Sequence, residues 1–301
     1  MLTDIAEDRN RLRVGVEKPE LAAVVRERLA RLSIPANAAI VELSTAMRPL
    51  VSLRDKFRPL RGGIQVNFGP GVCTLWFLAV RSGVSGMITA SHCTLTQGGV
   101  QNTIFHQPNL SATNRIGLET RDPGYFRGGV CPPGSRCRYS DSAFVRIPHT
   151  AGPAVSATRG SVALPVALDS VTVSGGSFRI TSENSAPLLN EMVSKVGRTT
   201  GWSQGRVVAT CVNTEVSGTD ITLLCQDWVK ANVNRGDSGS PVFRITNSPA
   251  PGDVRLYGVL WGGGRVPGFG TVFAFSSLGT SNLQRSAEMG TLTTCAAAFS
   301  C

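Results

Sequence analysis

The sequence predicts an all-β barrel or sandwich. Thirty-three Gly and 17 Pro among 301 residues favour many turns. Short apolar runs of strand length recur between clusters of Gly, Pro, Asn and Ser, which is the spacing of an all-β domain. No apolar stretch approaches the roughly 20 residues of a membrane helix, so no membrane span is predicted. Strands are expected over residues 74–80, 86–90, 143–147, 206–209, 221–225, 256–261 and 271–276.

Residues 1–43 differ from this pattern and predict a small strand–helix–strand unit. Residues 12–16 alternate like a strand, and apolar residues after Pro19 recur every three or four positions, the period of a helix. Proline suits the first helical turn, and the segment 33–35 ends the helix before a second strand over 39–43. About 35 residues are too few to bury a stable core alone, so this unit is expected to pack on another body.

Residues 44–62 predict a basic and exposed connector. The segment contains five basic residues and two prolines, and it ends at Arg61-Gly62-Gly63. Exposed segments of this kind are preferred sites of proteolytic cleavage. The sequence therefore predicts a processing region that precedes a larger domain over residues 63–301.

Eight cysteines, an even number, predict disulfides. None has Cys-x-x-Cys spacing, which disfavours zinc and thioredoxin-like sites, and we predict no metal and no cofactor. Four disulfides indicate an oxidising compartment, although the residues alone permit 105 connectivities. Met1-Leu2-Thr3-Asp4 does not begin a signal peptide. We therefore expect an extracellular protein whose signal lies upstream of this chain; the alternative is that the compartment is not oxidising.

The formal charge of +10 raises the question of nucleic-acid binding. The 26 Arg and 4 Lys are scattered without a run of five, and no stripe of alternating basic and aromatic residues occurs. Nucleic acid is therefore not predicted as a partner. A basic module that binds cell wall or nucleic acid stays an alternative, and its affinity would fall steeply with salt.

Three short segments carry the residues of a nucleophilic site. His92 follows the predicted strand 86–90, Asp141 precedes an apolar strand, and Ser238 lies in the sequence Arg-Gly-Asp-Ser-Gly-Ser-Pro. A serine hydroxyl is a poor nucleophile until an imidazole accepts its proton, and a buried carboxylate orients that imidazole. Glycines beside the serine let the N–H groups of Gly236 and Ser238 reach a developing oxyanion.

Each segment alone has an ordinary structural explanation. A His after an apolar strand is commonly a half-buried, hydrogen-bonded residue, and an Asp before a strand is commonly a turn residue. Gly-Asp-Ser-Gly is a common loop sequence. The three segments together favour a serine nucleophile with its base and its carboxylate.

These motifs resemble the chymotrypsin-like serine peptidases over roughly residues 64–276, and more closely the bacterial secreted branch that includes alpha-lytic protease and the streptogrisins. The resemblance implies two perpendicular six-stranded antiparallel β-barrels, about 63–155 and 156–301, with the active site between them. It implies that His92 is the general base, that Asp141 orients it, and that Ser238 is the nucleophile. The amides of Gly236 and Ser238 would form the oxyanion hole.

The same resemblance assigns the disulfides and one buried ion pair. The pairs it implies are Cys73 with Cys93, Cys131 with Cys137, Cys211 with Cys225, and Cys295 with Cys301. Asp237 beside the nucleophile would be buried and would need a cation. Lys195 matches that role best, and Arg198 is the second choice.

The resemblance also implies a zymogen and a substrate pocket. The first unit is similar to part of a folding-assisting prosegment, which would be a partner of the mature enzyme until cleavage near residues 58–63. Polypeptides would be the substrates of a monomeric serine endopeptidase that works through an acyl-enzyme. The pocket would be formed by Asn232, Leu260, Trp261, Gly262 and Gly270. With no carboxylate and two glycines, it predicts an apolar or aromatic residue before the scissile bond (P1).

One departure from the family keeps a second function open. Leu260 stands where relatives place a Ser whose hydroxyl supports the catalytic Asp, so one hydrogen bond to Asp141 would be lost. The alternative function is therefore a catalytically weak or inactive homologue that uses its cleft to bind proteins.

Overall fold

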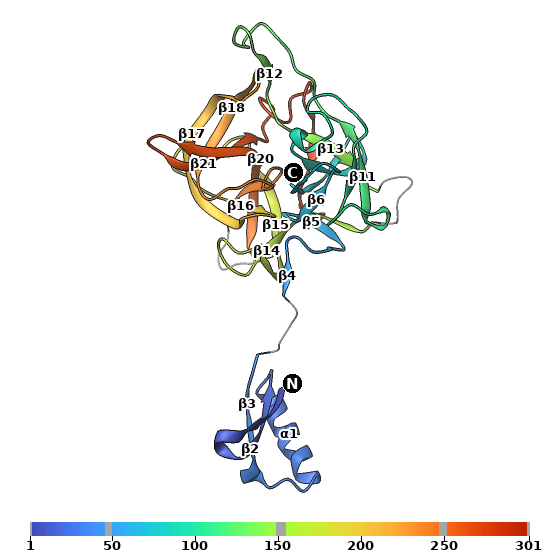
Figure 1. Ribbon diagram of the computed structural model, residues 1–301, viewed down its shortest axis with the longest axis vertical. Coiled ribbons are helices and arrows are strands. Elements are labelled where there is room, and N and C mark those ends of the chain that lie inside the picture. Colours follow the sequence, from blue (N-terminus) through green and yellow to red (C-terminus); the bar gives the residue numbers. More distant parts are fainter. Residues whose placement is uncertain (1, 46–49, 149–154, 247–251, 300–301) are drawn as a thin grey trace. The chain divides into compact units, whose positions relative to one another are not determined.

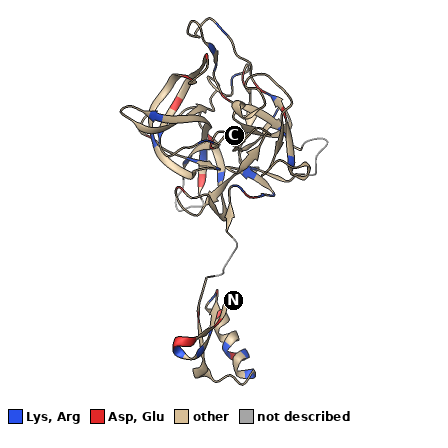
Figure 2. Cartoon of the chain, viewed as in Figure 1, with Lys and Arg blue, Asp and Glu red and all other residues tan. Residues whose placement is uncertain are grey.

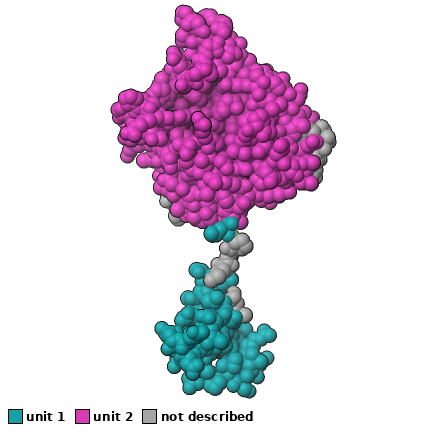
Figure 3. All heavy atoms as spheres, in the orientation of Figure 1, with its two compact units in different colours: residues 1–50 teal, residues 51–301 magenta. Residues whose placement is uncertain are grey.

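The computed structural model describes residues 2–45, 50–148, 155–246 and 252–299. The chain forms two compact units, Met1–Leu50 and Val51–Cys301, coloured separately in Figure 3. In the view of Figure 2, Lys and Arg are spread over both units. Within the described ranges, no helix has the length and apolar character needed to cross a membrane.

The smaller unit is a three-stranded sheet with one helix (Figure 1). β1 (Leu2–Ala6) pairs antiparallel with β2 (Arg11–Val16), which pairs parallel with β3 (Ala39–Leu43). Because parallel strands need a crossover, α1 (Glu20–Arg31) connects β2 to β3. The predicted helix and both predicted strands are confirmed, and β1 is an additional strand. The assignment of this unit as a prosegment stays a prediction.

The first barrel of the larger unit has six antiparallel strands, when the bent run β7–β8 is taken as one. The order around the ring is β6, β7–β8, β9, β13, β11, β10 and back to β6. The strands are β6 (Gln65–Asn67), β7 (Val72–Thr74), β8 (Leu78–Arg81), β9 (Val84–Thr89), β10 (Ile104–His106), β11 (Arg115–Arg121) and β13 (Ala143–Arg146). A short strand from the carboxyl-terminal segment, β22 (Leu292–Thr293), pairs with β8 outside the ring.

The second barrel is also a closed ring of six antiparallel strands. Their order is β16, β17, β18, β21, β20, β19 and back to β16. The strands are β16 (Met192–Gly197), β17 (Gly201–Glu215), β18 (Ile221–Lys230), β19 (Pro241–Ile245), β20 (Asp253–Val266) and β21 (Gly270–Ser277). The strands predicted at 206–209, 221–225 and 256–261 lie inside longer ones.

A hairpin connects the two rings. β14 (Ala157–Pro165) and β15 (Thr172–Glu183) pair antiparallel, and β15 lies parallel beside β20. The second ring therefore begins at Met192, whereas the sequence placed the second barrel from about residue 156. β12 (Arg136–Arg138) also joins the second barrel. It pairs parallel with β18, whereas the hairpin pairs with β20.

The expected exposure of the connector is wrong for the apolar residues of 51–62, although Val51, Arg54, Asp55 and Lys56 are exposed. β4 (Val51–Ser52) pairs with β15, and β5 (Leu60–Gly62) pairs with β14. Leu53 and Leu60 are fully buried in the core of the larger unit, and Phe57 is almost so. The basic residues of this stretch alternate with these three apolar residues, whose side chains are buried in the core.

Candidate active site

The pairing of two strands of the first barrel brings His92 and Asp141 together. His92 lies in the short 3-10 turn Ser91–Cys93 that follows β9, and Asp141 lies just before β13. β9 and β13 pair antiparallel with Thr89 opposite Ala143. The residues that follow one strand and precede the other therefore meet at the same end of the sheet. The disulfide from Cys93 to Cys73 on β7 fixes the turn to the next strand.

The His92 ring and the Asp141 carboxylate form a short hydrogen bond. Nδ1 of His92 lies 2.5 Å from Oδ2 of Asp141, and the His92 backbone N–H donates to Oδ1 at 3.2 Å. The Asp141 side chain is fully buried, whereas that of His92 is 34% exposed. The arrangement orients the imidazole through its Nδ1 side and leaves about a third of the His92 side chain exposed.

Two further donors reach the other carboxylate oxygen, and the sequence motifs did not point to either. Gln97 Nε2 donates to Asp141 Oδ1 at 3.1 Å, and Arg138 Nη2 donates to the same atom at 2.8 Å. Burial alone would raise the pKa of Asp141, but the charge and hydrogen bond of His92 lower it, followed by the charge of Arg138 and the bond from Gln97, to about 2. Asp141 is therefore an anion near neutral pH.

Leu260 does not contribute to this cluster. Its side chain is buried in the core of the second barrel with Phe273 and Phe275. On the neighbouring strand β21, the hydroxyl of Ser276 instead accepts a hydrogen bond from the Asp141 backbone N–H at 3.2 Å. Ser276 fixes the backbone of Asp141 and leaves its carboxylate to the donors named above.

Ser238 lies in a tight turn before β19 of the second barrel, against β7 of the first. Gly236 has φ +93°, and a Cβ added there would lie 2.6 Å from Thr199 Oγ1, so the turn requires glycine. Thr74 binds this turn twice: its N–H donates to the Ser238 carbonyl at 2.8 Å, and its hydroxyl donates to the Gly236 carbonyl at 2.8 Å. Thr89 Oγ1 donates to the Thr74 carbonyl at 3.1 Å, which links the turn to the strand before His92.

The Ser238 hydroxyl donates to the carbonyl of Trp261 at 3.4 Å. Among the described residues no hydrogen bond joins it to His92, so two of the three predicted side chains are bonded and the third faces another acceptor. Within the same ranges, the N–H groups of Gly236 and Ser238 donate to no other protein group. Both amides are thus available for an anionic ligand beside the hydroxyl.

Asp237 is held by a buried cation, as predicted. Nζ of Lys195 lies 3.2 Å from Oδ2 of Asp237, and both side chains are fully buried. The N–H groups of Thr199, Thr200 and Asn234 and the Thr200 hydroxyl also donate to this carboxylate. Burial lowers the pKa of Lys195, and the charge of Asp237 acts against that shift. The second choice, Arg198, donates to Gln65 and Thr199 instead.

A cavity of about 350 Å³ opens beside Ser238. Leu260 and Gly262 line it, as the sequence predicts, whereas Asn232, Trp261 and Gly270 are not among its lining residues. The lining is completed by Val233, Asn234, Arg235, Ser238, Gly263, Gly264, Arg265 and Thr271. The side chain of Asn232 donates to Asp169, and that of Trp261 donates to Gln226.

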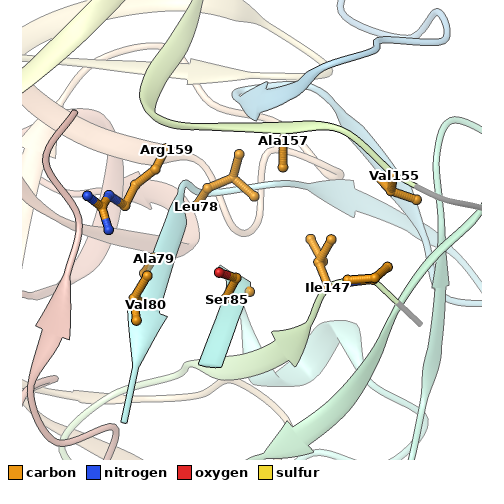
Figure 4. Close-up of a pocket in the computed structure, with 10 residues that line it drawn as sticks. Leu78, Ala79, Val80, Ser85, Ile147, Val155, Ala157 and Arg159 are labelled. Atoms are coloured by element: carbon orange, nitrogen blue, oxygen red, sulfur yellow. The ribbon is translucent and has the colours of Figure 1, made fainter. Parts of the chain in front are cut away.

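A second cavity, of about 280 Å³, holds none of the predicted site residues (Figure 4). Apolar side chains such as Leu78, Ile147 and Val155 line it, together with Arg159. The Nε of Arg159 donates to the carbonyl of Cys295. Without a paired acid and base, this cavity offers no equivalent of the His92–Asp141 site.

Three disulfides of the predicted pairing are present, Cys73–Cys93, Cys131–Cys137 and Cys211–Cys225. The fourth predicted pair includes Cys301, which lies outside the described residues. Cys73, Cys93 and His92 lie close enough together to hold a metal ion. The two sulfur atoms are bonded to each other, so they do not provide the thiolate ligands that zinc prefers.

The chain is similar in structure to several serine proteases of known structure. No protein-family profile and no curated protein matches the chain. A glutamic-acid-specific serine protease of known structure is 19% identical, and the match covers 73% of this chain and 94% of that one with a TM-score of 0.50. Thermobifida fusca protease A (22% identity, 72% and 91% coverage) and Nocardiopsis protease (24%, 72% and 92%) each have a TM-score of 0.49.

The likeness agrees with the strand order found here. Two antiparallel rings of six strands are joined so that His92 and Asp141 come from the first and Ser238 from the second. The larger unit of the chain therefore has the double β-barrel fold of the chymotrypsin-like serine proteases.

Proposed function

We propose that the chain is a serine endopeptidase that hydrolyses polypeptides through an acyl-enzyme. The observation that carries the proposal is the short bond from His92 Nδ1 to the buried Asp141, at 2.5 Å, with Ser238 on a glycine turn at the barrel junction. A buried anion that orients a partly exposed imidazole is the arrangement needed to make a general base. The three disulfides support export to an oxidising compartment, and we expect a monomer.

In the proposed reaction, the Ser238 hydroxyl turns from the Trp261 carbonyl toward Nε2 of His92 and attacks the substrate carbonyl. His92 accepts the hydroxyl proton, and Asp141 stabilises the resulting imidazolium. The free N–H groups of Gly236 and Ser238 bind the oxyanion that forms. His92 then protonates the leaving amine as the C–N bond breaks. In the second half of the reaction, His92 accepts a proton from the water molecule that attacks the acyl carbonyl, and it returns that proton to Ser238 Oγ as the ester bond breaks and the acid leaves.

A fluorophosphonate probe tests this proposal, because it reacts with a serine activated by a base. We expect stoichiometric labelling of the 301-residue chain or its processed form, mapped by mass spectrometry to Ser238. The absence of labelling at every pH from 5 to 10, in both forms, would support the alternative of an inactive homologue that binds proteins.

The lining of the cavity beside Ser238 supports a revised P1 preference. Leu260 and Gly262 agree with the apolar preference predicted from the sequence, but Arg235 and Arg265 line the same cavity, and none of its lining residues is acidic. Guanidinium groups bind carboxylates in a bidentate manner. We therefore expect a P1 Glu or Asp to be accepted best, with an apolar P1 as the competing outcome.

Peptides that differ only at P1 measure this preference. We expect kcat/KM to be higher for P1 Glu than for P1 Phe, and lowest for P1 Arg. Because the guanidinium is exposed, Arg265→Gln should lower the Glu value by about fivefold, equivalent to about 1 kcal/mol, and leave the Phe value unchanged. Arg206→Gln, an exposed Arg that donates to Asn190, is the control. Faster turnover of Phe that does not respond to Arg265→Gln would favour the apolar pocket.

We also propose that the smaller unit is a prosegment and that the chain is a zymogen. Cleavage at 58–63 is disfavoured, because Leu60 is buried and β5 is paired with β14. Removing residues 51–62 would also take Leu53 and Phe57 from the core. We therefore expect the mature amino terminus at or before Val51, which intact-mass analysis of the processed protein determines. A mature chain that begins after Leu60 would contradict this.

A further inference from the structure

We propose that Arg138 is a positioning residue of the active site, which fixes the Asp141 carboxylate in place of the hydroxyl that Leu260 lacks. The inference rests on the proposed peptidase function. Arg138 would act through Asp141 on His92, and it has no contact with substrate. Its second effect would be to limit how strongly the shared carboxylate stabilises a protonated His92.

The geometry of the guanidinium supports this role. Arg138 is fully buried, and its Nη2 donates to Oδ1 of Asp141 at 2.8 Å. Nη1 donates to Oδ1 of Asp122 at 3.1 Å and to the carbonyl of Pro123 at 2.9 Å. Arg138 therefore binds the carboxylate oxygen that His92 Nδ1 does not use, and Asp122 and Pro123 hold it in that position.

Arg138 reaches Asp141 from a strand that is paired with the second barrel. β12, which ends at Arg138, pairs in parallel with β18, and the disulfide Cys131–Cys137 closes the loop immediately before it. The Arg138 guanidinium also lies 5.2 Å from the ring centre of Tyr125. The position of Arg138 is thus set by β18, a disulfide and an aromatic ring rather than by Asp141 itself.

A purely structural role, neutralising Asp122, does not account for these contacts. Asp122 already accepts hydrogen bonds from Ser91 Oγ at 2.8 and 2.7 Å and from the Gly98 N–H at 3.3 Å. One arm of the guanidinium would be enough for Asp122. Nη2 makes a shorter bond to Asp141 than Nη1 makes to Asp122, and Asp141 is the carboxylate that orients His92.

The charges around Arg138 decide the sign of its effect. The acidic groups that face it are Asp141, Asp122, Tyr125 and Glu288, and Arg136 lies on the same strand. A cation on Asp141 Oδ1 competes with protonated His92 for the same negative charge. Removing the cation should therefore favour the protonated imidazole, so that catalysis would need a higher pH.

Three variants test this inference through the pH dependence of fluorophosphonate labelling and of kcat/KM. For Arg138→Gln we expect the maximal kcat/KM to fall between about 10- and 100-fold, and the acidic limb to move up by about one pH unit. Asp122→Asn removes the carboxylate that competes with Asp141 for hydrogen bonds from Arg138, so the acidic limb of this variant should move down. Arg138→Lys keeps the charge and should restore the wild-type limb.

Arg136→Gln is the matched control. Arg136 lies two residues before Arg138 and forms an exposed ion pair with Asp220, so this variant removes the same charge outside the site. Its profile should equal that of the wild type. If Arg138→Gln does not fold, the double variant Arg138→Gln with Asp122→Asn removes the cation together with one of its partners. That variant should show a lower maximal kcat/KM than Asp122→Asn alone.

The outcomes separate the inference from the proposed function. If the wild type is not labelled at any pH, the peptidase function fails. If the wild type is labelled but Arg138→Gln and Asp122→Asn keep its acidic limb and lose only thermal stability, Arg138 is structural and the inference is wrong.

Discussion

Ser238→Ala should lower kcat/KM for a peptide substrate by about 10⁵- to 10⁶-fold and abolish fluorophosphonate labelling. The reason is that His92 and Asp141 act through the nucleophile: without the Ser238 hydroxyl, the imidazole that Asp141 orients has no proton to accept from residue 238. A small residual rate would remain, because the amides of Gly236 and residue 238 can still bind an oxyanion.

The comparison variant for this experiment is Ser217→Ala. Ser217 is an exposed serine in the turn between β17 and β18 of the same barrel. It should retain the activity and the labelling of the wild type. If Ser238→Ala kept more than about a hundredth of the activity, the nucleophile would be another residue and the proposed mechanism would be incorrect.

Lys195→Met should lower the free energy of unfolding of the larger unit by about 3–5 kcal/mol, measured by urea denaturation. The substitution keeps most of the side-chain volume but leaves the fully buried Asp237 without its cation, and an uncompensated buried charge is strongly destabilising. Four hydrogen bonds to Asp237 would remain. They stabilise the carboxylate but do not neutralise it.

The loss should extend from stability to activity, because Asp237 adjoins Ser238 in the turn that carries the two amides proposed to bind the oxyanion. Removing the charge as well, in Lys195→Met with Asp237→Asn, should recover part of the lost unfolding free energy. Lys56→Met, at an exposed lysine, is the control and should unfold like the wild type. Equal unfolding free energies for Lys195→Met and Lys56→Met would show that the buried pair contributes little.

Local patterns in the sequence located several of the barrel strands, whereas strands such as β11, β15 and β16 were not predicted. Runs of apolar residues bounded by turn residues are sufficient to locate β9, β13, β18 and β21, because these strands are buried on the barrel interior. The Gly residues at 236 and 239 indicated a tight turn, and both have positive φ in the structure. The helix of the smaller unit followed from its apolar period, with Pro19 marking its start.

What the sequence did not predict depends on contacts between distant segments. Arg138 has no local signal beyond its neighbouring Cys137, and its importance arises only because β12 pairs with β18. Arg265 likewise lines the cavity beside Ser238 because the pairing of β20 with β21 places it opposite Thr271, which also lines the cavity. The charges of residues 51–62 indicate an exposed segment, but Leu53 and Leu60 bury part of it through pairing with distant strands.

The hydrogen bonds of Thr74 have a wider consequence for how the two halves of the domain depend on each other. A threonine of one half supports the reactive turn of the other, so that turn is incomplete in an isolated half. Reactivity at Ser238 would thus report whether the whole domain is assembled, and a chain with one intact barrel and one loosened barrel should be chemically silent while much of its secondary structure persists.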